Sequence, residues 1–392
     1  MAKISVLIPD GESTLTKHVV HCLSVDKDIK VHILSKDPNA NIRHSRLISS
    51  FKSYDLPYTA PSVPGLESDQ ELAELIRFHH YDSSVQDQVT DAILRRAAEI
   101  KADVIFPVDE HIIRILANSA DKISKVAKLP PLPDFETFTV AIDKWKLAGF
   151  LDKHDVPHPK TIRYSAATSD DEVRRLKFPV IIKPTNQGNA MGIELYQDPD
   201  KLLVFLKAQK KHEYILQPFI KGYDIDCSLL ALNGKILAYT IQKGIVFSEI
   251  KFRAAVGIEF VFEEKVIRIV EKMMKLMNWS GVAHIDLRYD QIEDMPKVLE
   301  INARYWGSLL GSKNAGVNFP LLAIKTLRNE TFEKPEYKLN RYFMGKSPIA
   351  RILKSAFKSG KEKVGLFETS LPYSLRDPVP SFFEILQKLR KI

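Results

Sequence analysis

The chain has 392 residues, of which 45% are hydrophobic and 27% charged, and its formal net charge is +8. This length exceeds the usual size of one hydrophobic core, so two or three domains are expected, and the composition excludes a disordered or fibrous protein. The two cysteines, Cys22 and Cys227, are far apart and lack metal-ligand spacing, so they support neither a disulfide framework nor a cysteine-ligated zinc site, and a reducing cytoplasm fits best.

The first part of the chain alternates short apolar strands with helical stretches. Residues 4–8, 31–34 and 104–107 have the apolar pattern of strands, and residues 84–101 have that of an amphipathic helix. This alternation predicts a parallel α/β domain over residues 1–130. The proline-rich stretch 129–134 then predicts a linker, because proline disfavours helix interiors and central strands.

The next part predicts a smaller domain over residues 131–220. A helical period runs from residue 137 to residue 153, and strands are expected at 180–183 and 214–217.

Two hairpins dominate the part that follows, residues 221–334. The strands 227–232 and 236–241 flank Asn233 and Gly234, which is a strong hairpin signal. A helix is expected over residues 263–277. The strands 282–289 and 297–303 then form a second hairpin, joined by a polar turn.

The second hairpin contains the most informative residues. Side chains alternate between the faces of a strand, so Asp286 lies on one face with His284 and Arg288, and Glu300 lies on one face with Asn302 and Arg304. Mg²⁺ prefers oxygen ligands, which Asp286, Glu300 and Asn302 supply, and Arg304 lies within reach of a transferring phosphoryl group. The alternative is a solvent-facing strand that merely carries charge.

Two lysines and a loop add to this pattern. Lys183 ends an apolar strand, and the loop behind it contains the small or polar residues Gln187, Gly188, Asn189 and Gly192, whose backbone N–H groups suit phosphate oxygens. Lys144 stands at the start of the helical stretch. Taken singly, the loop is equally a hairpin connection, and Lys144 is equally a solvated helix-start lysine.

A further strand-to-loop segment covers residues 215–224. Its backbone at Gln217, Pro218 and Ile220 suits an adenine edge, and Asp224 suits ribose hydroxyls; the alternative is a plain connection between strands.

The order of these pieces along residues 4–326 resembles the ATP-grasp superfamily, in particular the carboxylate–amine ligases related to the carbamoyl phosphate synthetase and D-alanine–D-alanine ligase group. The resemblance implies the ATP-grasp fold, whose class is α/β and α+β. This fold has a parallel α/β pre-ATP-grasp domain, a small lid domain and an antiparallel-sheet domain. It implies that ATP and Mg²⁺ are cofactors, and that a carboxylate is activated as an acyl phosphate and passed to an amine.

Carried over residue by residue, Lys144 and Lys183 look like the nucleotide lysines, and Asp286, Glu300 and Asn302 look like the magnesium ligands. Arg304 resembles the arginine that steadies the acyl phosphate. The loop with Gln187, Gly188, Asn189 and Gly192 looks like the lid loop, Pro218 and Ile220 look like the adenine contacts, and Asp224 looks like the ribose-binding acid. Gln217 stands where many members have glutamate, so the preference for ATP is an assumption.

Two other functions stay open: a non-catalytic ATP-binding module of the same fold, and a bicarbonate-activating, carboxylase-like enzyme. The second is disfavoured, because the Val-Glu-His stretch of biotin carboxylases is replaced by Trp306-Gly307-Ser308. Small-molecule carboxylates and amines are the expected partners. Residues near predicted strand ends are candidates for contacting them, although surface charge is the alternative: Arg43, Arg46, Asp109, Glu110 and His111.

Residues 335–392 form a basic extension that the resemblance does not explain. Twelve Lys or Arg stand there against five Asp or Glu, yet no nucleic-acid-binding motif accompanies them, and nucleic acid is not expected as a partner. Residues 347–359 have a basic amphipathic helical pattern. Such a helix packs on its own domain or lies on a membrane surface, and no stretch is apolar and long enough to span a membrane.

Overall fold

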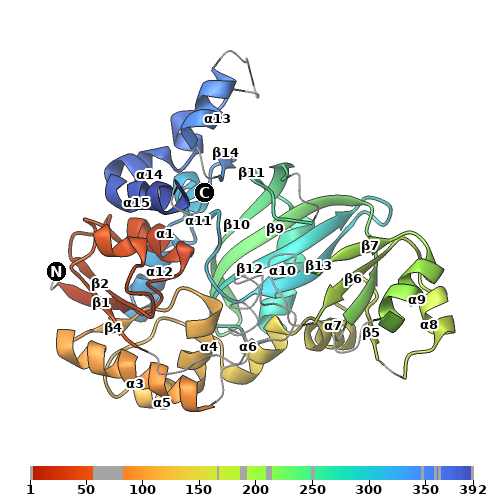
Figure 1. The fold of residues 1–392 in the computed structure, drawn as a ribbon, viewed down its shortest axis with the longest axis horizontal. Helices are drawn as coiled ribbons and strands as arrows, with labels where there is room; N and C mark the ends of the chain where they lie inside the picture. The colour runs from red at the N-terminus through yellow and green to blue at the C-terminus, as the bar shows by residue number, and fades with distance from the viewer. Residues whose placement is uncertain are drawn as a thin grey trace.

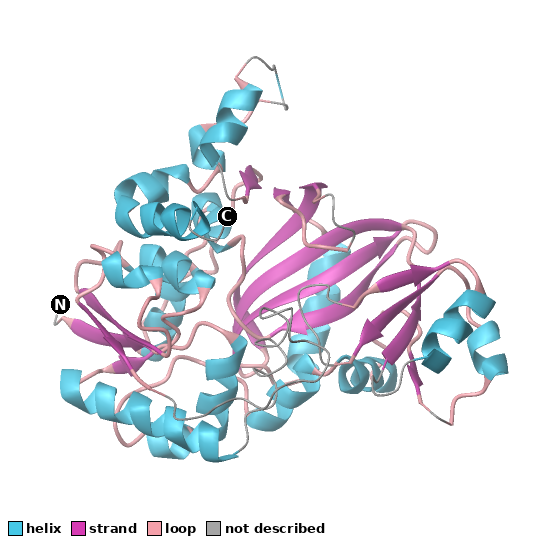
Figure 2. Cartoon of the chain, viewed as in Figure 1, coloured by secondary structure: helices cyan, strands magenta, loops and turns pink. Residues whose placement is uncertain are grey.

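The computed structural model describes residues 3–55, 83–165, 167–185, 192–208, 214–248, 252–345, 348–356, 360 and 363–389. These residues form three sheets with flanking helices (Figures 1 and 2). One sheet is parallel and two are antiparallel, which confirms the predicted fold class.

The N-terminal sheet has four parallel strands in the order β3-β2-β1-β4. Its inner strand β1 is a nearly continuous apolar run, as expected of a parallel strand that is covered on both faces. The predicted strands and the predicted helix 84–101 are confirmed within a few residues. The elements of this part are β1 (Ile4–Ile8), α1 (Thr14–Leu23), β2 (Ile29–Ser35), η1 (Asn41–His44), β3 (Ser50–Ser53), α3 (Ser83–Ile100), β4 (Val104–Ile105), α4 (Glu110–Asn118) and α5 (Ala120–Ile123).

The small sheet, in the order β5-β8-β6-β7, lies on the right in Figure 1, with α8 and α9 beside it. Its core is a separate apolar cluster that includes Val180, Leu202 and Leu216. The elements of this part are α6 (Phe135–Ile142), α7 (Lys144–Lys153), β5 (Ile162–Tyr164), α8 (Asp170–Arg174), β6 (Val180–Pro184), β7 (Glu194–Tyr196), α9 (Pro199–Ala208) and β8 (Tyr214–Pro218).

One sequence prediction about this region is wrong. The helical period from 137 to 153 is not a single helix, because the chain leaves the helical conformation at Asp143 (φ −93°, ψ 112°). The Asp143 side chain accepts hydrogen bonds from the backbone N–H groups of Trp145 and Lys146 and so caps α7. The break places Lys144 at the start of a new helix.

The large sheet has six strands in the order β13-β12-β9-β10-β11-β14. Both predicted hairpins are confirmed, and Asn233 and Gly234 have the positive φ angles of the turn between β9 and β10. The elements are β9 (Gly222–Leu232), β10 (Lys235–Val246), β11 (Gly257–Val261), α10 (Glu264–Leu276), β12 (Gly281–Asp290), β13 (Met295–Asn302) and β14 (Arg341–Phe343).

The two faces of this large sheet are covered differently. One face packs on α10, with Cys227 and Ile285 in a shared apolar cluster. On the opposite face, Leu230 and Val282 join a cluster with residues of the N-terminal sheet. Further along β9 and β12, this second face becomes polar, and the candidate site lies there.

Much of the last part of the chain packs against the N-terminal domain around α1 and η1, whereas α13 projects away from it (Figure 1). Asn318 donates to the backbone oxygen of Cys22 at 2.9 Å, and the hydroxyl of Ser45 donates to Asp377 at 2.5 Å. The elements are α11 (Leu309–Ala315), α12 (Phe319–Leu327), α13 (Pro348–Ser355), η3 (Leu366–Glu368), α14 (Leu371–Arg376) and α15 (Pro378–Leu389). Among the described residues, no helix combines the length and apolarity needed to cross a membrane.

Candidate active site

Three neighbouring strands of the large sheet bring polar residues together. In the register between β12 and β13, Asp286 pairs with Glu300 and His284 with Asn302. In the register between β12 and β9, Asp286 pairs with Asp226. Because alternate residues share a face, these side chains form one polar surface on the face opposite α10.

The three predicted magnesium ligands lie within this surface. Asn302 donates to Asp286 Oδ2 at 3.3 Å, and Glu300 is hydrogen-bonded to Asp286. Burial, reinforced by the charges of Glu300 and Asp226, raises the pKa of Asp286 well above its usual range. Carboxylate and amide oxygens that converge in a partly buried acidic cluster fit a hard divalent cation, which would relieve the repulsion between the acids.

Both predicted nucleotide lysines reach the same surface from the small-sheet side. Lys144 Nζ lies 3.2 Å from Glu300 Oε2. Burial opposes ionisation of Glu300, but Lys144, a hydrogen bond with Asp286 and Lys183 together lower the pKa of Glu300 to about 2. Lys183, on β6, is only 7% exposed, and burial lowers its pKa to about 8. The site therefore combines closely spaced carboxylates with two cations.

The predicted adenine hinge is held by hydrogen bonds within the protein. The buried Gln217 side chain donates to Thr161 Oγ1 at 2.8 Å, and Arg288 donates to the backbone oxygens of Ile220 and Gly222 at 2.7 and 2.8 Å. Arg288 also donates to Asp224. Pro218 ends β8 immediately before this turn.

The lid loop falls largely outside the described residues. Gln187, Gly188 and Asn189 lie there, so the structure does not place them. Gly192 is described and has φ +66°, a left-handed conformation that side chains rarely adopt and that suits glycine.

Arg304 connects the polar surface to the N-terminal domain. Its guanidinium donates to Asn302 Oδ1 at 3.0 Å, and its Nε lies 3.8 Å from Asp109 Oδ1. Asp109 caps α4 and accepts from Ser13 Oγ at 2.7 Å.

A cavity of about 400 Å³ lies beside Asp109 in the N-terminal domain. Its lining is mostly acidic or polar, with one lysine: Asp10, Glu12, Ser13, Thr14, Lys36, Asp37, Asp109 and His111. Asp10 accepts from the backbone N–H of Val108 at 2.8 Å, and burial raises the pKa of its carboxyl group well above its usual range. The cavity therefore lies at the carboxyl end of β1, where ligands of open α/β sheets bind.

The substrate candidates from the sequence divide into two groups. Asp109 and His111 line this cavity, and Glu110 lies between them; burial raises the pKa of Glu110. Arg43 and Arg46 are exposed. Arg43 donates to Pro38 and Asn39, and the backbone N–H of Arg46 donates to Asp377, so their contacts join surface segments and do not involve the polar surface.

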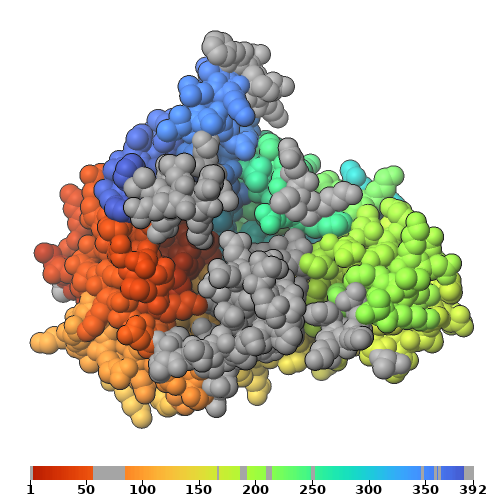
Figure 3. Space-filling model, in the orientation of Figure 1, coloured from red at the N-terminus to blue at the C-terminus, as the bar shows by residue number. Residues whose placement is uncertain are grey.

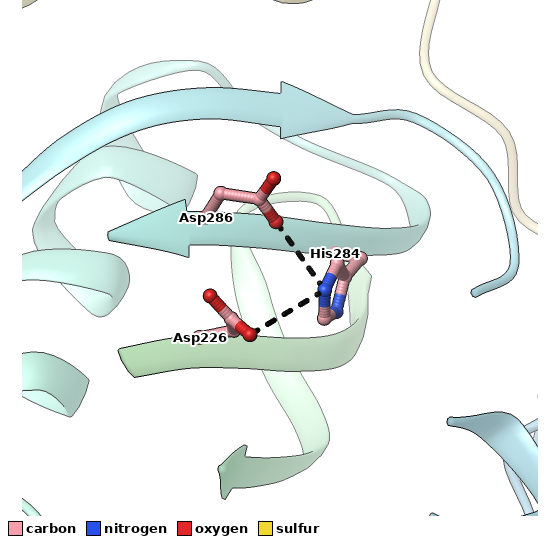
Figure 4. Close-up of side chains that lie close together, drawn as sticks. All are labelled: Asp226, His284 and Asp286. Atoms are coloured by element: carbon pink, nitrogen blue, oxygen red, sulfur yellow. Dashed lines mark ion pairs between the residues drawn. The ribbon is translucent and has the colours of Figure 1, made fainter. Parts of the chain in front are cut away.

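Sequence reasoning missed Asp226, and it named His284 only as a neighbour of Asp286. His284 Nε2 lies 3.3 Å from Asp286 Oδ1 and 4.0 Å from Asp226 Oδ2, and Figure 4 shows the three side chains pointing toward one another. Burial and the charge of Arg304 lower the pKa of His284 to about 3, and burial raises that of Asp226 to about 7. The available signal was the alternation of Asp224, Asp226 and Ser228 along β9.

Known proteins resemble the central part of this chain in sequence. Residues 141–308 match the family model of the ATP-grasp domain. The D-alanine–D-alanine ligase of Buchnera aphidicola subsp. Schizaphis graminum is 28% identical in a 219-residue alignment that covers 48% of this chain and 69% of that protein.

Two solved structures share the fold. The ADP complex of N5-carboxyaminoimidazole synthetase from Staphylococcus aureus has a TM-score of 0.61 at 14% identity, covering 85% of this chain and 79% of that one. The L-amino acid ligase from Bacillus licheniformis has a TM-score of 0.57 at 18% identity, covering 84% and 74%. At these identities the likeness establishes the fold.

Proposed function

We propose that this chain is an ATP-grasp enzyme of the carboxylate–amine ligase type, which joins a small carboxylate to an amine with release of ADP and phosphate. The substrate carboxylate attacks the terminal phosphorus of ATP, which forms an acyl phosphate and frees ADP. The amine then attacks the acyl carbon, and phosphate leaves. This order requires the site to bind concentrated negative charge and to orient two substrates.

One observation carries the proposal: Lys144 Nζ lies 3.2 Å from Glu300 on the polar surface of the large sheet, and the buried Lys183 of β6 is near enough for its charge to lower the pKa of Glu300. Two lysines from one side and carboxylates from the other form a site that fits a nucleotide polyphosphate together with a cation. A surface strand that merely carries charge would not bury Lys183 to 7% exposure.

In this proposal, the nucleotide lies between the small and large sheets. Lys144 and Lys183 contact its phosphates. Gln187, Gly188 and Asn189, which lie outside the described residues, and Gly192 stay candidates for phosphate contacts. The backbone at Gln217, Pro218 and Ile220 contacts adenine. Asp224, oriented by Arg288, accepts from the ribose hydroxyls.

Asp286, Glu300 and Asn302 would hold Mg²⁺, whose contribution when bound is to neutralise phosphate charge. Lys183 supplies positive charge where the terminal phosphoryl group transfers. Arg304 is fixed by Asn302 and by the backbone oxygen of Tyr305, and it steadies the acyl phosphate and the oxyanion that develops when the amine attacks its acyl carbon.

The acceptor amine enters from the N-terminal cavity. The carboxylates of Asp37 and Asp109 line it together with the buried acids Asp10 and Glu12 and the single lysine Lys36, so the lining offers several oxygen acceptors to an ammonium group. Asp109 contacts both this cavity and Arg304, which brings the amine close to the acyl carbon.

The division of the chain at residues 130, 220 and 334 belongs to the same proposal, as does a cytoplasmic location. The small sheet lies between the first two boundaries, whereas β14 of the large sheet lies beyond the third. Membrane contact through the basic tail remains a prediction; Ile349 and Leu353 on α13 are 55% and 64% exposed.

The proposed function is tested by incubating the purified protein with Mg-ATP and pooled amino acids, small carboxylates and amines. ADP, AMP and new masses are followed together. We expect ADP, phosphate and a condensation product that appears only when both substrate classes are present. Binding of ATP without any product would indicate a non-catalytic ATP-binding module, and stoichiometric AMP with pyrophosphate would rule out the acyl phosphate.

A further inference from the structure

Asp226, His284 and Asp286 form a compact group with one ligand atom from each residue, and these atoms all lie within 4.8 Å of one another (Figure 4). The residues come from two adjacent strands, β9 and β12, in which Asp226 pairs directly with Asp286. Backbone pairing fixes their spacing, so the group belongs to the sheet framework and not to a flexible surface.

We propose that Asp226, His284 and Asp286 bind a divalent transition-metal ion of the Zn²⁺ or Mn²⁺ class, at a site distinct from the proposed magnesium site. The two sites overlap at Asp286, which would be a ligand in both, and they differ in their other two ligands. An imidazole nitrogen with two carboxylates is a donor set for these ions, whereas Mg²⁺ prefers oxygen ligands alone.

The distances fit such an ion. Zinc bonds to histidine nitrogen and carboxylate oxygen are about 2.0–2.2 Å long, so two tetrahedral ligands lie about 3.4 Å apart. The separation between His284 Nε2 and Asp286 Oδ1 is 3.3 Å, and that between His284 Nε2 and Asp226 Oδ2 is 4.0 Å. A small rotation of the Asp226 carboxylate would shorten the distance between His284 Nε2 and Asp226 Oδ2 to about 3.4 Å.

His284 and Asp226, the two ligands that the magnesium set lacks, are both oriented by neighbouring groups, as metal ligands usually are. His284 Nδ1 lies 2.8 Å from Ser228 Oγ, so when Nδ1 carries the ring proton and donates to Ser228, Nε2 presents its lone pair to the two acids. Gln242 donates to Asp226 Oδ2 at 3.3 Å, and Ser308 donates to Gln242 at 2.7 Å. Trp306 stacks on the imidazole ring, with 5.8 Å between centroids.

The three side chains are partly shielded from solvent, which favours their binding an ion over their being hydrated individually. The side chains of His284, Asp226 and Asp286 are 13%, 20% and 31% exposed. The remaining exposure leaves a route for the ion and positions for water ligands.

The test is calorimetric titration of the nucleotide-free full chain with Zn²⁺ alone. We expect one tight site in the unmodified protein, weakened at least tenfold in Asp226→Asn and in His284→Asn. His32→Asn is the matched control, because His32 Nδ1 also lies 2.8 Å from a serine hydroxyl, that of Ser50, away from this group. It should bind Zn²⁺ as the unmodified protein does.

Glu300→Gln separates this proposal from the proposed function. Glu300 belongs to the proposed magnesium set alone, so its variant should lose Mg²⁺-dependent turnover and keep the Zn²⁺ site. Loss of tight Zn²⁺ binding in Glu300→Gln but not in Asp226→Asn would place the ion on the magnesium set and overturn the inference. Unchanged binding in both Asp226→Asn and His284→Asn would also overturn it.

A measurement on the unmodified protein avoids any folding defect in the variants. X-ray absorption at the zinc edge should show one imidazole among oxygen ligands at about 2.0–2.2 Å. A spectrum without imidazole, or with several, would contradict the proposed donor set.

Discussion

The ammonium nitrogen of Lys144 lies 3.2 Å from Oε2 of Glu300, so an ion pair joins the first residue of α7 to β13, an edge strand of the large sheet. The two side chains are 10% and 30% exposed. Because both are proposed to contact the nucleotide or its cation, ligand binding would change the partners of this pair. The pair therefore couples the position of α7 to the state of the site.

Removing the charge of Glu300 tests its electrostatic role. Glu300→Gln keeps the size of the side chain, so turnover should fall by orders of magnitude while the fold survives. Lys144, whose side chain is 10% exposed, loses this ion pair, and stability should fall by about 1–3 kcal/mol. Product formation at limiting Mg²⁺ and thermal unfolding measure the two effects. Near-normal turnover under these conditions would exclude the proposed role of Glu300.

The two lysines should differ from an ordinary surface lysine in their selectivity. Lys183→Ala and Lys144→Ala should weaken ATP binding much more than adenosine binding, because the lost attraction is to phosphate charge. Lys201→Ala, on the exposed face of α9, is the control and should change neither affinity. Calorimetry with both ligands checks this, and equal ATP affinity in all three variants would contradict the phosphate assignment.

The lowered pKa of Lys183 predicts how ATP affinity depends on pH. Burial brings this pKa to about 8, and ATP binds the protonated form. Affinity should therefore be constant below pH 8 and should fall as pH rises through that value, by up to about tenfold per pH unit. Lys183→Arg keeps its charge at every accessible pH and should lose this dependence. A decline that persists unchanged in Lys183→Arg would assign it to another group.

Gly222, beside the hinge, and Gly149, inside α7, are a matched pair of glycines for testing how closely β9 packs against β12. At Gly222, an added Cβ would lie 1.8 Å from the backbone oxygen of Tyr289, whereas nothing lies within 4 Å of one at Gly149, inside α7. Gly222→Ala should destabilise the protein by about 1–3 kcal/mol, because β9 must move away from β12 to make room for the added methyl group. Gly149→Ala should stabilise it by about 0.5–1 kcal/mol. Chemical denaturation of both variants tests the pairing, and equal effects would contradict it.

Strand and hairpin positions were predictable because their signals are local. The apolar runs that became β1 and β6, and the Asn233-Gly234 turn, carry their own periodicity and turn chemistry. The break at Asp143 was missed, since an aspartate inside an amphipathic pattern is equally a polar-face residue. Only the backbone shows that it caps α7.

The candidate site was predictable only within one hairpin at a time. Alternation placed Asp286 and Glu300 on their strand faces, but Asp226 lies on β9, and its pairing with Asp286 depends on a strand order that no local pattern reveals. The approach of Lys183 to Glu300 likewise depends on how two sheets pack. Such long-range contacts arise from the packing of the whole core.

The central claim, that a carboxylate is activated as an acyl phosphate, is tested most directly by following oxygen atoms. Carboxylate substrates labelled with ¹⁸O are incubated with the protein, Mg-ATP and an amine, and the released phosphate is analysed by mass spectrometry. Attack by the carboxylate on the terminal phosphorus, followed by loss of phosphate to the amine, transfers one labelled oxygen to each phosphate released. The account predicts this one-to-one transfer, and product formation with unlabelled phosphate would contradict it.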